Sequence, residues 1–163
     1  MANKLLFYYK VFFLFIFLVL LLLNYNCLHN PPHWDNIVGL HNQAIWLAKN
    51  NFDYGKLYQE GQQFWHGGSN IYPYAVMPVI YGILYKCCTP YTVHYLGHVF
   101  NILCLAVACT LSYVIMLRYS RDKLSAILWS FAALSEPVMA GRTAALGLEC
   151  PLIAFMVLIL FMT

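Results

Sequence analysis

The sequence predicts an all-α protein, a polytopic membrane helical bundle with amphipathic juxtamembrane helices in its first outer loop. Apolar residues make up 62% of the 163 residues and charged residues only 9%, whereas a soluble domain carries about 25% charged residues. Several apolar segments approach the roughly 20 residues that a transmembrane helix needs. Tyr and Phe are abundant, with 13 and 11 copies, which is typical of chains with aromatic side chains at membrane–water interfaces.

The first predicted span covers residues 5–23, LLFYYKVFFLFIFLVLLLL. Its length is sufficient to cross the hydrocarbon layer. A cleaved signal peptide is the alternative, but no A-x-A-like site follows Leu23, so a retained anchor is favoured.

Residues 24–95 form the predicted outer loop, which contains an interfacial helix at about residues 35–50. The apolar residues of this helix recur near helical spacing, at positions 37, 40, 44, 47 and 48. The other face holds the polar residues Asn42, Gln43 and Lys49. We therefore expect an amphipathic helix on the membrane surface, capped by Asp35 and anchored by Trp34 and Trp46.

A second apolar segment of the loop covers residues 73–86 and contains two prolines, Pro73 and Pro78. It is too short to cross a bilayer comfortably, so we expect an interfacial or re-entrant helix. Three further spans are predicted at about residues 96–117, 124–140 and 150–163, so that residues 1–163 form a single transmembrane module.

Positive charges predict the orientation. If segment 73–86 does not cross, the RYSRDK stretch at 118–123 lies on the same side as Lys4 and Lys10. The positive-inside rule then places this side in the cytoplasm and loop 24–95 outside. The predicted protein is multi-pass in the plasma or inner membrane, with a cytoplasmic N-terminus.

Two carboxylates are candidate catalytic groups, Asp35 and Glu149. Each can simply cap or begin its own helix. However, the chain has only six acidic residues, and ionisable residues at a membrane boundary are functional candidates. The basic residues that could meet a phosphate are His33, His41, His66 and Arg142, although the histidines can also be ordinary polar residues of an aqueous loop. The six Cys show no metal-like spacing, so no metal site and no cofactor are predicted. No basic run indicates nucleic acid.

Five short motifs follow one another along the chain: HWDN (33–36), NNFDYG (50–55), YPYAVMP (72–78), RYSRDK (118–123) and GLECPLIAF (147–155). Their order resembles the N-terminal module of membrane glycosyltransferases of the C superfamily (GT-C). The nearest types in pattern are the aminoarabinose and protein O-mannosyl transferases. The sequence differs at Asn36, where many relatives have an acid, and at Ile71 and Tyr72, where the aminoarabinose type has Glu-Lys.

The resemblance implies transfer of a sugar from a polyprenyl-phosphate donor to a lipid, glycan or protein acceptor on the non-cytoplasmic face. Asp35 matches the first-loop aspartate of the family, which acts as catalytic base or orients the acceptor, and Glu149 matches the acid at the start of a later span. Positive charge or hydrogen-bond donors would stabilise the phosphate leaving group. Because relatives have many more spans, we expect a fragment that is inactive alone. The alternative is a small non-enzymatic membrane protein with a scaffold or assembly role, whose partners are the membrane lipid and other chains.

Overall fold

The computed structural model describes residues 2–28, 30–31, 40–60, 76–135 and 149–162. Within these ranges the secondary structure is helical and contains no strand, which confirms the all-α prediction. The described elements are α1 (Ala2–Leu23), the 3-10 helix η1 (Tyr25–Cys27), α3 (Asn42–Lys49), α4 (Tyr54–Glu60), α5 (Val76–Cys87), α6 (Pro90–Ser120), α7 (Lys123–Ser135) and α9 (Glu149–Met162).

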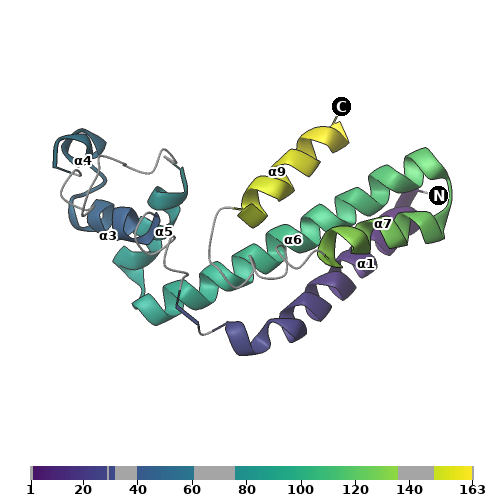
Figure 1. The fold of residues 1–163 in the computed structure, drawn as a ribbon, viewed down its shortest axis with the longest axis horizontal. Helices are drawn as coiled ribbons and strands as arrows, with labels where there is room; N and C mark the ends of the chain where they lie inside the picture. Colours follow the sequence, from purple (N-terminus) through teal and green to yellow (C-terminus); the bar gives the residue numbers. More distant parts are fainter. Residues whose placement is uncertain (1, 29, 32–39, 61–75, 136–148, 163) are drawn as a thin grey trace.

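Helices α1, α6, α7 and α9 form what we name the long-helix bundle. The other three pack along α6, and α1 and α7 run antiparallel to it (Figure 1). The core between α1 and α6 is apolar, so its stability derives from burial of large aliphatic side chains. Its buried members are Ile16, Leu20, Leu28, Ile102, Leu105, Ala106 and Cys109.

Helices α3, α4 and α5 form what we name the short-helix unit, which lies beyond the N-terminal end of α6 (Figure 1). Its main contact is between α3 and α5, where Leu40 and Ala44 pack against Tyr81. Gly82 allows this close approach. A Cβ atom on Gly82 would lie 3.1 Å from the Ala44 carbonyl oxygen and 2.8 Å from the Phe52 ring.

The predicted amphipathic helix is only partly as expected. Leu40, Ala44 and Leu47 are buried, as the periodicity predicts. However, Gln43 and Trp46 are also buried, so Gln43 is not on a polar face and Trp46 is not an interfacial anchor. The reason is tertiary packing, because Trp46 contacts α4 in a cluster with Leu47 and Leu57. Trp34 and the proposed cap Asp35 lie outside the described residues.

Helix α6 begins at Pro90, six residues before the predicted span 96–117. The Thr89 hydroxyl accepts a hydrogen bond from the Thr92 backbone N–H, and proline occupies the first turn. Both features favour a helix start, since the first turn leaves backbone donors free. The helix that contains the predicted span 96–117 therefore begins at residue 90.

Of the described helices, only α6 is both long and apolar enough to cross a membrane, judged by length and composition. The other predicted spans correspond to shorter apolar stretches of the described helices: Phe7–Leu23 within α1, Lys123–Ala132 within α7 and Cys150–Met162 within α9. Part of predicted span 124–140 lies outside the described residues. For example, the 13 residues of α7 measure about 20 Å at the helical rise, less than the roughly 30 Å of hydrocarbon.

The outer faces of the long-helix bundle expose many large apolar side chains. On α9, Leu152, Phe155 and Leu160 are more than half exposed, and Leu128 and Trp129 of α7 are equally so. Contiguous apolar patches of this kind mark surfaces that lipid or another protein covers.

Candidate functional site

Four of the predicted site residues lie outside the described residues: Asp35, His33, His66 and Arg142. Another predicted site residue, Glu149, is the first residue of α9, and its side chain is likewise outside them. The sequence-based expectation that Asp35 and Glu149 open onto one cavity, on the order of 10 Å apart, therefore stays a prediction.

A hydrogen-bonded set of aromatic rings joins the short-helix unit to the start of α6. His41 Nδ1 lies 2.7 Å from the Tyr85 hydroxyl oxygen, and the same oxygen lies 3.3 Å from His94 Nε2. The Tyr81 ring lies beside His41, with ring centroids 4.7 Å apart. We name His41, Tyr81, Tyr85 and His94 the histidine–tyrosine cluster.

Helical spacing explains how the cluster assembles. Tyr81 and Tyr85 are four residues apart, so both lie on the face of α5 that meets α3. His41 immediately follows the buried Leu40 at the start of α3, and His94 follows the buried Val93 in the first turns of α6. Apolar packing of α3, α5 and α6 thus brings the four rings together.

The proton balance of the cluster is constrained. A tyrosine hydroxyl has one proton to donate and lone pairs with which to accept. If Tyr85 donates to His41 Nδ1, then His94 Nε2 must carry the proton that it donates to the Tyr85 oxygen. If Tyr85 donates to His94, the His41 Nδ1–H must donate instead. With both rings neutral, these two arrangements are alternative tautomers. A net proton transfer through the Tyr85 hydroxyl requires that the donating imidazole start as an imidazolium, which becomes neutral as the other ring takes up the proton.

Burial keeps the central hydroxyl protonated. It raises the pKa of Tyr85 to about 12, so at neutral pH the hydroxyl retains its proton. Burial, together with the nearby Tyr85, Cys104 and Cys150, also raises the pKa of Tyr81 well above its ordinary range.

Three buried polar side chains near these helices have no hydrogen-bond partner among the described residues. These are the amide of Gln43, the hydroxyl of Tyr81 and the amide of Asn101 on α6. Gln43 is 7% exposed, and Tyr81 and Asn101 are 1% and 0% exposed. An unsatisfied buried polar group costs roughly 1–3 kcal/mol, so such groups mark places where a ligand, water or another segment supplies a partner.

His98 links α6 to the segment that follows η1. Its Nε2 lies 3.0 Å from the carbonyl oxygen of Asn30, and it is buried. His94 and His98 are one helical turn apart, so both face the same side of α6. Among the described residues, no group of three or more His, Cys, Asp or Glu side chains is arranged to hold a metal ion.

Of the cluster, sequence reasoning selected only His41, as a polar loop residue that could meet a phosphate. The structure instead buries it against α5. The i, i+4 pairs Tyr81/Tyr85 and His94/His98 are the signal that could have located the cluster, because each pair lies on one helix face. Comparison with protein-family models, with curated proteins and with solved structures gave no match.

Proposed function

We propose that the chain is the N-terminal part of a membrane glycosyltransferase that uses a polyprenyl-phosphate-linked sugar on the non-cytoplasmic face, with the histidine–tyrosine cluster at the edge of the sugar site. The observation that supports it best is the His41–Tyr85–His94 hydrogen-bonded chain. In an apolar protein, a buried relay of titratable rings is costly to build for structure alone.

The dimensions of α6 support a membrane-embedded arrangement. Its 31 residues measure about 46 Å, whereas the hydrocarbon layer is about 30 Å thick. If Arg118 and Arg121 lie at the cytoplasmic boundary, as the positive-inside rule favours, the first turns of α6 extend beyond the opposite boundary. His94 belongs to these turns and would meet water-soluble parts of a substrate.

The residues divide the chemistry as follows. Asp35 accepts the proton of the acceptor hydroxyl, since a carboxylate aimed at that proton assists bond formation. His41 follows Asp35 by six positions in the sequence. It transmits a change in protonation through the Tyr85 hydroxyl to His94. Glu149 begins α9 and orients the sugar. His33, His66 and Arg142 supply donors to the phosphate leaving group.

Donor binding tests this proposal. The purified chain would be titrated with a panel of polyprenyl-phosphate sugars, and retained donor would be measured by native mass spectrometry. We expect at least one donor to bind more tightly than the polyprenol without phosphate. His66→Ala and Arg142→Gln, which remove proposed donors to the phosphate, should weaken binding about tenfold, as expected for loss of a charged hydrogen bond. Asp122→Asn, at the opposite end of α6, should not change it. Equal retention of donor and free polyprenol would contradict the proposal.

A scaffold role is the second candidate function, and the exposed apolar face of α9 favours it. Such a face could pack against helices of a partner chain. In that case Phe155→Ala would weaken co-purification of the partner, while no polyprenyl-phosphate sugar would bind. The donor titration therefore separates the two candidates.

A further inference from the structure

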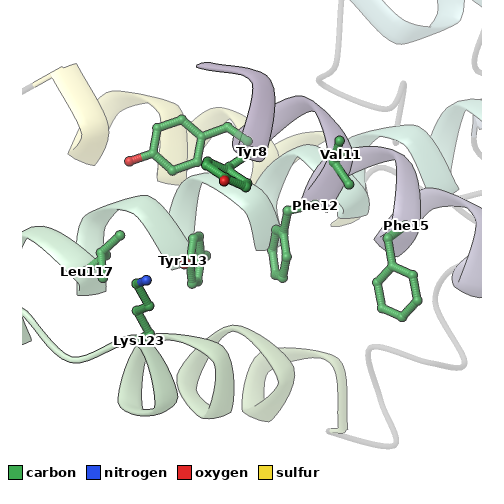
Figure 2. A pocket seen from close by; sticks show the side chains of 8 residues that line it. Tyr8, Val11, Phe12, Phe15, Tyr113, Leu117 and Lys123 are labelled. Atoms are coloured by element: carbon green, nitrogen blue, oxygen red, sulfur yellow. The ribbon is translucent and has the colours of Figure 1, made fainter. Parts of the chain in front are cut away.

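A second feature of the molecule lies at the opposite end of α6 from the histidine–tyrosine cluster. It is a groove of about 620 Å³ between the first half of α1, the end of α6 and the start of α7 (Figure 2). This volume is within the range of small-molecule sites. The groove is lined by Tyr8, Tyr9, Val11, Phe12, Phe15, Tyr113, Leu117 and Lys123.

The walls of the groove are apolar and aromatic. Phe12 stacks on Tyr113 with ring centroids 4.6 Å apart, which fixes the contact between α1 and α6. Val11 and Phe15 remain about half exposed along the rim. Rigid rings and aliphatic groups arranged in this way suit a flexible hydrocarbon chain.

One cation enters this apolar groove. The Lys123 side chain extends from the start of α7 toward Tyr113 and Leu117 (Figure 2). The neighbouring Asp122 carboxylate is occupied elsewhere, since it accepts hydrogen bonds from the Ser125 backbone N–H at 2.8 Å and from the Ser125 hydroxyl. Arg118 stacks over the Phe161 ring at 4.6 Å. Among the side chains that the structure describes, Lys123 is therefore the cation positioned to meet a ligand in the groove.

We propose that the groove holds an acyl chain of an anionic phospholipid from the cytoplasmic leaflet, with the lipid phosphate at the Lys123 ammonium. Charge complementarity favours this occupant. An apolar helix packed into the groove would cover the ammonium without a counter-charge, which is costly. A zwitterionic lipid fits less well, because its headgroup carries a cation that would lie near the Lys123 ammonium. Anionic lipids are concentrated in the cytoplasmic leaflet, and each basic residue near that surface attracts them.

Lipid titration followed by native mass spectrometry tests the proposal. The purified chain in neutral detergent would receive phosphatidylglycerol or phosphatidylcholine with matched acyl chains. We expect phosphatidylglycerol to bind roughly fivefold more tightly, and Lys123→Gln to remove this preference. Lys123→Arg should keep it. The matched control is Lys49→Gln, which removes an exposed cation of the short-helix unit and should leave both affinities unchanged.

A second variant tests the groove rather than the charge. Val11→Trp adds bulk to a half-exposed rim position and should reduce binding of both lipids while helicity by circular dichroism is unchanged. Equal affinity of the original chain for the two lipids would overturn the proposal. So would equal effects of Lys123→Gln and Lys49→Gln, because binding would then follow total charge and not this groove.

Discussion

The short-helix unit and the long-helix bundle differ in the kind of side chain that they bury. The short-helix unit, with the first turns of α6, buries rings and amides that need partners, and the His41–Tyr85 hydrogen bond links residues 44 positions apart. The long-helix bundle has an apolar core and also shows apolar side chains outward. Specific polar contacts therefore concentrate near the N-terminal end of α6, where the short-helix unit packs against it. The rest of the bundle depends on side-chain volume and presents a surface suited to lipid.

The largest expected effect tests the long-helix bundle. Ile102→Ala removes a fully buried side chain between α1 and α6. We expect the free energy of unfolding to fall by about 2–5 kcal/mol, because truncation leaves a cavity. Unfolding would be followed in mixed micelles by circular dichroism. As the control, Leu128→Ala on the exposed face of α7 should change it by less than about 0.5 kcal/mol. Similar losses for both variants would show that the face of α7 is packed rather than open.

The second prediction concerns the α3–α5 contact. Gly82→Ala places a methyl group against the Ala44 carbonyl oxygen and the Phe52 ring. We expect a loss of about 1–3 kcal/mol from overpacking. The neighbouring Ile83 is half exposed, so Ile83→Val should be nearly neutral. If Gly82→Ala left the free energy of unfolding unchanged, the Phe52 ring would move aside without cost, and α3 and α5 would not be tightly packed.

The third prediction isolates the polar contacts of the short-helix unit. Tyr85→Phe keeps the ring but removes the hydroxyl that joins His41 and His94. We expect about 1–2 kcal/mol of destabilisation, since an imidazole nitrogen then lacks its partner. Nitrogen NMR of the histidine rings should also show altered tautomers. Tyr25→Phe, an exposed position, is the control, and unchanged histidine spectra in Tyr85→Phe would contradict the proposed proton balance.

The smallest effect is expected at the start of α7. Hydrogen bonds from the Ser125 side chain and backbone lower the pKa of Asp122 below its ordinary value of 3.8. A carboxyl group with a depressed pKa in the folded state stabilises the fold above its unfolded-state pKa, and the contribution is lost as the pH falls through the folded value. The protection of the amides in the first turn of α7 against exchange, relative to their intrinsic rate at each pH, should therefore fall below about pH 3.8. Asp122→Asn should remove this pH dependence.

Local pattern was sufficient for part of the fold. Apolar runs located α1, α5, α6 and α9, because each helix buries or exposes a continuous apolar sequence. Hydropathy placed the start of α6 too late, since Thr92 and His94 interrupt the apolar pattern of residues 90–95, although Thr89-Pro90 is a recognisable helix start. Trp46 and Gln43 were assigned to the wrong environments, because their burial depends on packing with other helices.

Less of the candidate site than of the fold could be predicted from the sequence. The cluster unites α3, α5 and α6, and no local rule predicts that His41 meets Tyr85 and His94. Spacing can place Tyr81 with Tyr85 on one face, but the partner of that face follows only from tertiary packing. Asp35, His33, His66 and Arg142 lie outside the described residues, so their roles rest on motif order alone.

The central claim is that the short-helix unit lies outside the membrane and the Lys123 end lies in the cytoplasm. Cys87 at the end of α5 and Ser120 at the end of α6 are both exposed, so each can report on one end. In a background with the other native cysteines replaced, a membrane-impermeant maleimide would be applied to intact cells. Our account predicts that Cys87 reacts from outside, whereas Ser120→Cys, with Cys87 also replaced, reacts only after the membrane is opened. Labelling of both positions from the same side would contradict it.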